Sequence, residues 1–403
     1  MPVNIFDIPQ EKAIIKKKWS LWLEVGFLFC MITFYVYVFL IYFPEYLSKN
    51  PIFFWVELLL IPLIIACIVF FFRIVVWNSE NIEAVSWNEH RAAYYRELLQ
   101  KGRINLDIVE LQIRLPDLNG SVDNVVKKNI LPVRYTPRGM HMARYLSFYP
   151  SKDEVINDEW IKERKVDLFN GIVSDLINDI YMHIKLLPAN TKVKVVCILD
   201  DDLKALAESI WRRCFDNVFP FERIDFSNDL SKSIDNWLDS YSDGYIVLIA
   251  ASFYGTELIS ENIADKSESV VFLLGRLNGD GKITNASSLG NFSRPEFDWT
   301  GIDKSLVWGG VNEESGLSGV IYSGLNQEEV KRLVLKTSDY MTESALSAYN
   351  YIDSGNYLGI CSPLTVFLQL KYVNEYLLPG KYLFVNKSND LLVSHFFSSI
   401  ADR

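Results

Sequence analysis

The sequence predicts a membrane hairpin of two helices followed by a layered α/β domain. Two apolar runs, Trp19 to Phe43 and Ile52 to Phe72, are each close in length to the roughly 20 residues that a helix needs to cross a bilayer. After the second run, short apolar stretches alternate with amphipathic ones through the rest of the 403 residues. Strands that alternate with helices are typical of a sheet covered by helices. We therefore expect an α/β domain held against one face of a membrane.

The charges that flank the two apolar runs predict their orientation. Lysines precede the first run and arginines follow the second, whereas the loop between the runs holds only Lys49 against Glu45. The flanking cations are Lys12, Lys16, Lys17, Lys18, Arg73, Arg91 and Arg96. Segments rich in lysine and arginine beside a membrane span lie mostly on the cytoplasmic side. Both termini are therefore expected in the cytoplasm, on a protein with two spans.

This pattern divides the chain into four parts. They are a cytoplasmic segment at 1–18, a transmembrane hairpin at 19–76 with spans at about 19–43 and 52–76, a helical connector at 77–104 and an α/β domain at 105–403. Within the connector, Ser86 to Lys101 is amphipathic at helical spacing.

The domain is expected to contain a largely parallel sheet. Asn105 to Leu115 alternates polar and apolar residues, which is the period of a strand. Further helices are expected at 166–187, 203–215 and 230–241, and further strands at 192–199, 221–226, 245–251 and 268–275. The uniformly apolar sequence at 245–251 predicts a strand that is buried on both faces, as in a parallel sheet.

Composition excludes several classes of function. The net charge of −10 disfavours nucleic-acid binding, because no basic stripe is present to neutralise phosphates. The five cysteines show no CxxC spacing, so neither a disulfide framework nor a zinc site is expected. No dinucleotide or phosphate-binding glycine motif occurs, and no cofactor is predicted.

The order of several segments resembles a known enzyme family. The segments are DGYIVLIAAS at 243–252, SESVVFLLGR at 267–276, GVIYSGL at 319–325, GNYLGICSPLTVFLQLKYVNEY at 355–376 and a closing pair at 382–386 and 391–397. This order resembles the β-ketoacyl synthases and other thiolase-fold proteins, over about Asn105 to Arg403. The resemblance implies a layered thiolase-like domain and a homodimer formed through a central strand.

The catalytic residues of that family are not matched. Such enzymes need a cysteine at a helix N-terminus, with histidine or asparagine to activate the acyl donor. Where the resemblance places a histidine-glycine motif, the chain has Asn356 to Gly359. Cys361 follows and is the best candidate nucleophile, although it falls on a different element from that of the family, and Cys197 lies in an apolar strand. The sequence therefore favours a degenerate domain without catalysis.

A run of three carboxylates follows the strand expected at 192–199. Asp200, Asp201 and Asp202 stand where α/β proteins often place metal ligands. An aspartate before a helix is also the usual cap of its free amides. We favour capping over magnesium binding.

The layout of the whole chain carries a second resemblance. Two N-terminal spans, the segment WNEHRAAYY just after them and a degenerate thiolase-like domain resemble accessory membrane proteins encoded among bacterial type VI secretion genes. This resemblance implies a bacterial inner-membrane protein that binds secretion components or an effector.

Three functions follow from these observations. The first is a non-catalytic membrane scaffold or adaptor, and the alternatives are a membrane-tethered acyl-ligand sensor and an acyltransferase or condensing enzyme. For a protein partner, the segment Phe292 to Gly310 is predicted to be a surface loop, because it mixes aromatic and charged residues with proline and glycine. Its expected contact residues are Arg294, Asp298, Trp299 and Trp308.

Overall fold

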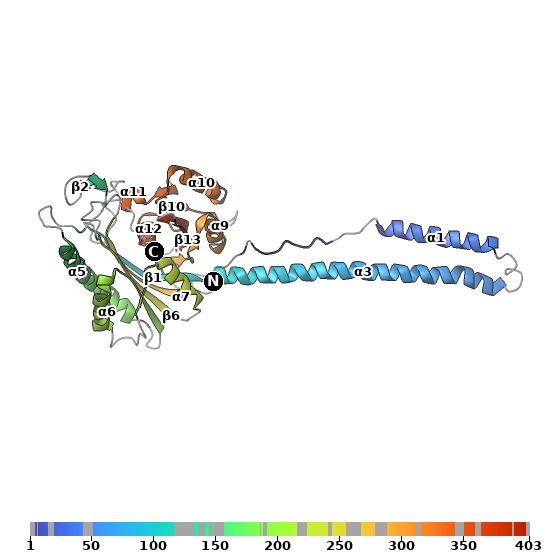
Figure 1. The fold of residues 1–403 in the computed structure, drawn as a ribbon, viewed down its shortest axis with the longest axis horizontal. Helices are drawn as coiled ribbons and strands as arrows, with labels where there is room; N and C mark the ends of the chain where they lie inside the picture. Colours follow the sequence, from blue (N-terminus) through green and yellow to red (C-terminus); the bar gives the residue numbers. More distant parts are fainter. Residues whose placement is uncertain are drawn as a thin grey trace. The chain divides into compact units, whose positions relative to one another are not determined.

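The structure is a computed structural model of the 403-residue chain (Figure 1). It describes residues 5, 7–14, 20–42, 51–116, 133–135, 142–144, 148, 157–185, 187, 192–215, 224–240, 244–254, 267–278, 288–311, 316–342, 350–358, 364–388 and 391–399. The chain forms two compact units, Asn4–Leu98 and Leu99–Arg403. Each unit is described by itself.

The Asn4–Leu98 unit is built from two helices, α1 (Ser20–Tyr42) and most of α3 (Pro51–Gly102). In α1, the window Val25–Tyr42 has a mean hydropathy of 2.2 and no buried residue. Within the described residues, α1 is the one helix that is long and apolar enough to cross a membrane. The predicted second span lies inside α3, which continues beyond it without a break. The two helices face one another at an apolar hollow of about 250 Å³ lined by Val25, Leu28, Phe29, Ile32, Cys67 and Phe70.

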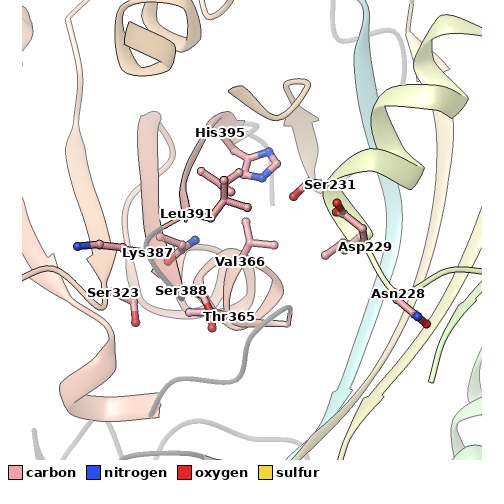
Figure 2. Close-up of a pocket in the computed structure, with 13 residues that line it drawn as sticks. Asn228, Asp229, Ser231, Ser323, Thr365, Val366, Lys387, Ser388, Leu391 and His395 are labelled. Atoms are coloured by element: carbon pink, nitrogen blue, oxygen red, sulfur yellow. The ribbon is translucent and has the colours of Figure 1, made fainter. Parts of the chain in front are cut away.

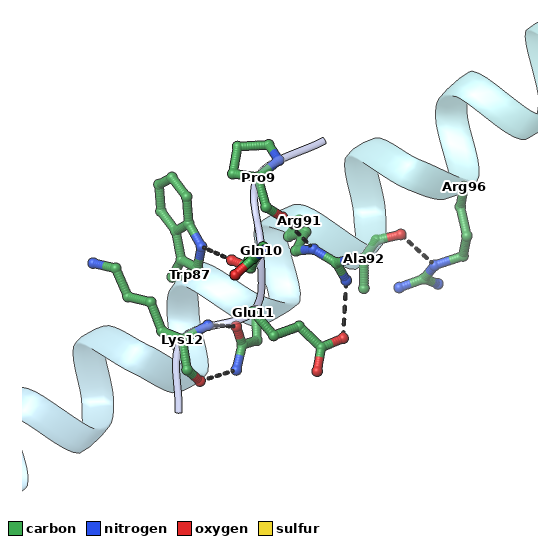
Figure 3. Close-up of polar contacts among 9 residues, drawn as sticks. Pro9, Gln10, Glu11, Lys12, Trp87, Arg91, Ala92 and Arg96 are labelled. Atoms are coloured by element: carbon green, nitrogen blue, oxygen red, sulfur yellow. Dashed lines mark hydrogen bonds and ion pairs between the residues drawn. The ribbon is translucent and has the colours of Figure 1, made fainter. Parts of the chain in front are cut away.

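An extended N-terminal segment, Pro9–Lys12, lies along the later part of α3 (Figure 3). Lys12 exchanges two backbone hydrogen bonds of 3.0 Å with the Asn88 side chain, and its Nζ lies 2.7 Å from Glu83. Arg91 donates to the Pro9 carbonyl at 2.7 Å and contacts Glu11 at 2.9 Å. We call this set of contacts the N-terminal clasp.

The Leu99–Arg403 unit begins with a half-domain in which one strand is followed by three helix–strand pairs and a last strand. The elements are β1 (Asn105–Arg114), α5 (Asp158–Lys185), β4 (Lys192–Ile198), α6 (Asp201–Phe215), β5 (Ile224–Phe226), α7 (Leu230–Asp239), β6 (Gly244–Ser252) and β7 (Ser269–Asn278). A separate two-stranded sheet, β2 (Val133–Tyr135) with β3 (Met142–Arg144), is inserted between β1 and α5.

The second half-domain repeats this order. Its elements are β8 (Gly290–Phe292), β9 (Glu296–Phe297), α9 (Asp298–Trp308), β10 (Gly319–Ser323), α10 (Gln327–Thr337), the 3-10 turn η1 (Ser338–Tyr340), β11 (Tyr351–Asp353), α11 (Gly355–Leu358), α12 (Thr365–Tyr376), β12 (Lys381–Ser388) and β13 (Leu391–Ser399). The third long helix of each half is therefore α7 in the first and α12 in the second.

The strands form a continuous mixed sheet in the order β11-β10-β12-β13-β8-β1-β7-β6-β4-β5, with β9 paired to β13. Each half contributes the same arrangement, in which its first strand pairs with its last and the remaining three are parallel. The halves meet where β1 and β8 pair antiparallel at Leu106↔Phe292. The domain is an internal duplication at the level of its topology.

Three hydrophobic clusters divide the domain into layers. One joins α5 and α6 to one face of β4, β6 and β7, and another joins α9 and α10 to β10, β12 and β13. The third contains α7 and α12 together with the remaining faces of both half-sheets. Along β6, Ile246 and Leu248 belong to the central cluster, whereas Val247 and Ile249 belong to the outer one. The order of layers is helix, sheet, helix, sheet, helix, with α7 and α12 in the centre.

The expectation of a largely parallel sheet is wrong. Strands β7 and β13 are antiparallel to both of their neighbours, including β1 and β8. Strands buried on both faces are uniformly apolar whichever way they run, so the apolar pattern did not reveal their direction. The predicted strands at 192–199 and 245–251 are found as β4 and β6.

Candidate functional site

A cavity of about 410 Å³ lies where α7 and α12 begin (Figure 2). It is lined by Asn228, Asp229, Leu230, Ser231, Ser323, Thr365, Val366, Asn386, Lys387, Ser388, Leu391, Val393 and His395. Most of these side chains are polar. The topology explains the gathering, because α7 and α12 are equivalent helices in the central layer and β10, β12 and β13 belong to the adjoining half-sheet.

The α7 side of the cavity is capped by a carboxylate. Asp229 is the N-cap residue of α7, and its side chain accepts a hydrogen bond of 3.0 Å from the Lys232 amide. The hydroxyl of Ser227 accepts from the Asp229 amide at 3.2 Å and fixes the turn before the helix. The charge of Asp229 therefore offsets the positive end of α7.

A buried amide pair holds α12 against β12 beside the cavity. Gln369 of α12 donates to Asn386 at 2.7 Å and accepts from it at 2.9 Å, and it also donates to Ser354 at 2.9 Å. Gln369 is fully buried. The charged residue of this strand end in the described lining is Lys387, whose Nζ lies 2.6 Å from Glu329. That contact holds the pKa of the Glu329 carboxyl below its ordinary value.

The imidazole of His395 lines the cavity in its uncharged form. Its ring stacks on Phe292 at a centroid distance of 4.4 Å, and its Nδ1 lies 3.4 Å from the Ser293 carbonyl. Burial lowers the pKa of His395 to about 4. Since a carbonyl only accepts, the contact with Ser293 assigns the proton to Nδ1 and leaves Nε2 as an acceptor.

Ser323 is the one cavity residue whose buried hydroxyl lacks a hydrogen-bond partner within the described lining. It ends β10, and 2% of the residue is exposed. A buried hydroxyl without a partner is destabilising unless something else supplies the bond.

These contacts suit the cavity to binding. Asp229, Lys387 and Asn386 are each held by a protein partner, and His395 is neutral near pH 7. The lining also contains the hydroxyl residues Ser231, Ser323, Thr365 and Ser388.

The predicted nucleophile cannot be placed. Cys361 lies outside the described residues. Asn356, from the segment expected to replace a histidine-glycine motif, lies in α11 and donates to Asp353 at 3.0 Å. Cys197 is in the core of the domain, where burial raises the pKa of its thiol to about 12. A thiol with that pKa is inert at neutral pH.

The three aspartates stand at the start of α6. Asp200 pairs with Lys165, and Asp201 pairs with Lys204, which lowers the pKa of the Asp201 carboxyl through a hydrogen bond. Among the described residues, no group of three or more histidine, cysteine, aspartate and glutamate side chains is arranged to hold a metal ion. α6 begins at Asp201, and capping of its amides by these aspartates stays a prediction.

The segment predicted as a surface loop forms β8, β9 and α9, so the loop prediction is wrong. Trp308 is 2% exposed and donates to Glu296 at 2.7 Å. Arg294 is also 2% exposed and lies 3.0 Å from Asp239. Asp298 is exposed, and Trp299 is half-buried under Arg332. A partner would therefore reach Asp298 and Trp299, and the predicted interface stays a prediction for these two residues.

Sequence reasoning missed the cavity. Its residues come from four separate stretches, and none carries a catalytic or metal-binding motif. One local signal was present, since Ser227, Asn228 and Asp229 before an amphipathic run are typical of a helix start.

Comparisons with known proteins give structural neighbours alone. No protein family and no curated protein sequence matches the chain. A solved type II polyketide ketosynthase in complex with its acyl-carrier protein matches at a TM-score of 0.45 and 12% identity, over 74% of this chain and 100% of that one. OleA from Xanthomonas campestris with bound cerulenin matches at 0.45 and 9%, over 75% and 99%. The 3-oxoacyl-(acyl carrier protein) synthase III of Xanthomonas oryzae matches at 0.44 and 8%, over 73% and 99%.

These neighbours include synthases of the kind that the sequence resembles. Their TM-scores are below 0.5, and their identities to this chain are 12% or lower.

Proposed function

We propose that this protein is a membrane-anchored sensor whose Leu99–Arg403 domain binds a small acyl ligand in the cavity between α7 and α12, without catalysis. The observation that carries the proposal is the 410 Å³ cavity itself, at the meeting point of two equivalent helix starts. Ligand sites are typically concave and combine apolar walls with a few oriented polar groups.

Binding is favoured over catalysis by how the polar groups are engaged. An acyl-transfer site needs a nucleophile beside a base that takes its proton. In the described lining, the carboxylate of Asp229 caps a helix, and the imidazole of His395 is buried with a pKa of about 4. A base with so low a pKa is poorly matched to chemistry at neutral pH.

The N-terminal clasp supports an anchor of two spans. Pro9–Lys12 precede α1, and their contacts Glu83 and Arg91 follow the apolar part of α3. If α1 alone crossed the membrane, these two groups of residues would lie on opposite sides and the clasp could not form. An anchor in which α1 and α3 both cross satisfies the clasp, and the lysines around it favour the cytoplasmic side.

The direct test is to look for the ligand. Full-length protein is purified from its own membranes in detergent, denatured, and the released small molecules are identified by mass spectrometry. The variant Ser231→Trp fills the α7 side of the cavity, and Ser209→Trp places the same side chain on the exposed face of α6 as a control. We expect an acyl compound with wild type and Ser209→Trp, and its loss with Ser231→Trp. Equal recovery from both variants, or no molecule from wild type, would refute the sensor.

Two further readings stay predictions of the sequence. In the enzyme reading, Cys361 is the nucleophile, and loss of acyl labelling in Cys361→Ala with retention in Cys214→Ala would support it. In the adaptor reading, the protein serves a type VI secretion system in a bacterial inner membrane. Affinity purification from native membranes would recover secretion components, and their absence would count against this reading.

A further inference from the structure

Two polar side chains stand next to each other in the cavity, at the ends of neighbouring strands. Ser323 ends β10 and is the register partner of Asn386 in the parallel strand β12, and both residues line the cavity. Side chains alternate between the faces of a sheet along each strand. Two positions earlier, Ile321 and Phe384 belong to the hydrophobic cluster of the central layer. Ser323 and Asn386 therefore continue the face that packs on the central helices, and Figure 2 shows Ser323 across the cavity from Asp229.

The hydroxyl of Ser323 has an unused capacity for hydrogen bonding. The residue is 2% exposed, and its Oγ has no hydrogen-bond partner among the described residues. By contrast, Ser354, just after β11, donates to the Tyr322 carbonyl at 3.0 Å and accepts from Gln369 at 2.9 Å. A buried hydroxyl without a partner is destabilising. A ligand atom that completes the bond would remove this cost.

The surrounding hydrogen bonds determine which way the amide of Asn386 is turned. A carbonyl only accepts, so Ser354 uses its proton on Tyr322 and must accept from the amide nitrogen of Gln369. Gln369 Oε1 then accepts from Asn386 Nδ2 at 2.9 Å. Among the described residues, this oxygen is the acceptor for Nδ2, which carries two protons. The second proton leaves Asn386 with a donor for a ligand.

The charged groups in the described lining do not offer a counter-ion to an anion. Asp229 is itself a carboxylate and accepts from the Lys232 amide at 3.0 Å. The cation Lys387 lies 2.6 Å from Glu329, and His395 is uncharged near neutral pH. A ligand with a full negative charge would lose its hydration here without gaining an unpaired cation as partner. The lining therefore favours an uncharged acceptor.

An apolar surface continues from the polar pair. Val393 of β13 is the register partner of Asn386, and it lines the cavity together with Leu391 and Leu230. Burial of a hydrocarbon chain against these side chains is favourable. A ligand that fills both parts carries an uncharged oxygen acceptor on a short hydrocarbon chain.

We infer that Ser323 and Asn386 form a carbonyl-binding site, in which the Ser323 hydroxyl and Asn386 Nδ2 donate hydrogen bonds to the carbonyl oxygen of an uncharged acyl amide or ester. A carbonyl oxygen has two lone pairs and accepts both bonds. This inference rests on the proposed ligand-binding function and adds the chemical class of the ligand, since it disfavours the free acid.

The experiment compares probes that share one hydrocarbon chain and differ in their head group. Binding of hexanamide, hexanoate and protonated hexylamine to the full-length protein in detergent is measured by calorimetry near neutral pH. The heat of titration into protein-free detergent is subtracted. We expect hexanamide to bind about tenfold more tightly than hexanoate, because the carboxylate loses its hydration without a cationic partner.

Ser323→Ala deletes one of the two donors. It is expected to weaken hexanamide about fivefold. Because this hydroxyl has no partner in the ligand-free protein, thermal denaturation of ligand-free Ser323→Ala is expected to show at least wild-type stability. Ser231→Ala removes the same atom on the α7 side of the cavity and is the matched control, with a change in hexanamide affinity of less than about twofold.

Asn386→Asp replaces the second donor with an acceptor. Hexanamide is expected to bind about fivefold more weakly to this variant than to wild type. Protonated hexylamine is expected to bind about fivefold more tightly, because the new carboxylate accepts its protons. A purely structural effect of the change would weaken both probes.

The outcomes separate this inference from the proposed function. Binding of hexanoate as tight as that of hexanamide, or unchanged hexanamide binding in Ser323→Ala, would refute the carbonyl-binding site while leaving the ligand cavity in place. No binding of any probe to wild type would also overturn the inference, whereas the sensor is judged by the molecule released from the native protein. If Asn386→Asp does not fold, Ser323→Ala with its stability measurement decides.

Discussion

The side chains of Gln369 and Asn386 form a closed pair, in which Gln369 Nε2 donates to Asn386 Oδ1 at 2.7 Å and Asn386 Nδ2 donates to Gln369 Oε1 at 2.9 Å. The pair joins the central helix α12 to the end of β12, and Asn386 itself lines the cavity. Gln369 is fully buried, so its amide depends on Asn386 and Ser354 for its hydrogen bonds. The pair fixes where the start of α12 stands against the cavity wall.

Gln369→Leu is therefore expected to destabilise the domain. The change leaves Asn386 and Ser354 without their partner, and we expect a loss of about 2–4 kcal/mol in the free energy of unfolding. Urea denaturation followed by tryptophan fluorescence measures it. Gln327→Leu, the same change on the exposed first turn of α10, is expected to alter stability by less than about 0.5 kcal/mol. Equal stability of the two variants would show that the amide pair contributes nothing.

The neutral state of His395 predicts a dependence of stability on pH. Its pKa is about 4 in the folded protein and about 6.5 in an unfolded chain. Between these values the unfolded chain binds the extra proton, so the free energy of unfolding rises with pH from about 4 to 6.5 and falls on acidification. The full contribution is about 3 kcal/mol.

This dependence is checked by denaturation at a series of pH values. His395→Gln removes the titrating group, so its stability is expected to fall less than that of wild type between pH 6.5 and 4. Ser209→Gln, at an exposed position on α6 that carries no titrating group, is expected to keep the wild-type slope. An unchanged slope in His395→Gln would mean that His395 is not the group held neutral.

The predicted contact residues Trp299 and Trp308 are expected to behave in opposite ways. Trp308 is buried and donates a hydrogen bond to Glu296. Trp308→Ala is therefore expected to lower the free energy of unfolding by about 3–5 kcal/mol, because it leaves a cavity. Trp299 is half-buried beneath Arg332 at 4.4 Å, and Trp299→Ala is expected to cost about 1 kcal/mol. Thermal denaturation measures both. A change in partner recovery with a folded Trp299→Ala protein would identify a contact residue, whereas comparable destabilisation by both variants would place Trp299 in the core as well.

The central strands β4 and β6 were predictable because each is a short, largely apolar run. The predicted strand at 245–251 lies inside β6, and the strand predicted at 192–199 differs from β4 by one residue. Their apolar character reflects burial between helix layers on both faces. An apolar strand buried on both faces has the same composition in a parallel and an antiparallel sheet. The sequence therefore did not predict that some strands run antiparallel to their neighbours.

The error at Phe292 to Gly310 has a different cause. Proline and glycine in this segment predict a loop, yet Gly301 is inside α9, where a Cβ would come within 2.9 Å of the Glu296 backbone. Gly309 follows the helix, and a Cβ there would lie 2.4 Å from the Phe396 ring. Both glycines permit close packing, a role that depends on neighbours distant in sequence. The cavity was not predicted because its lining residues, such as Ser323, Thr365 and His395, are distant in sequence and come together only in the fold.

The N-terminal clasp predicts a specific cross-link in native membranes. Lys12 Nζ lies 2.7 Å from Glu83, and both side chains are exposed. A carbodiimide joins such an amine and carboxylate directly, so we expect a Lys12–Glu83 cross-linked peptide by mass spectrometry. The product requires both residues on the same side of the membrane, as an anchor with two spans provides.

Controls for the cross-link lie within the same chain. Lys336 and Asp303 are 2.6 Å apart in the Leu99–Arg403 domain and are expected to cross-link in the same digest. Lys12→Arg keeps the positive charge but removes the reactive amine, so it should abolish only the Lys12–Glu83 product. Recovery of the Lys336–Asp303 product without the Lys12–Glu83 product in wild type would show that the clasp does not form in the membrane. The support that the clasp gives to a second span in α3 would then be lost.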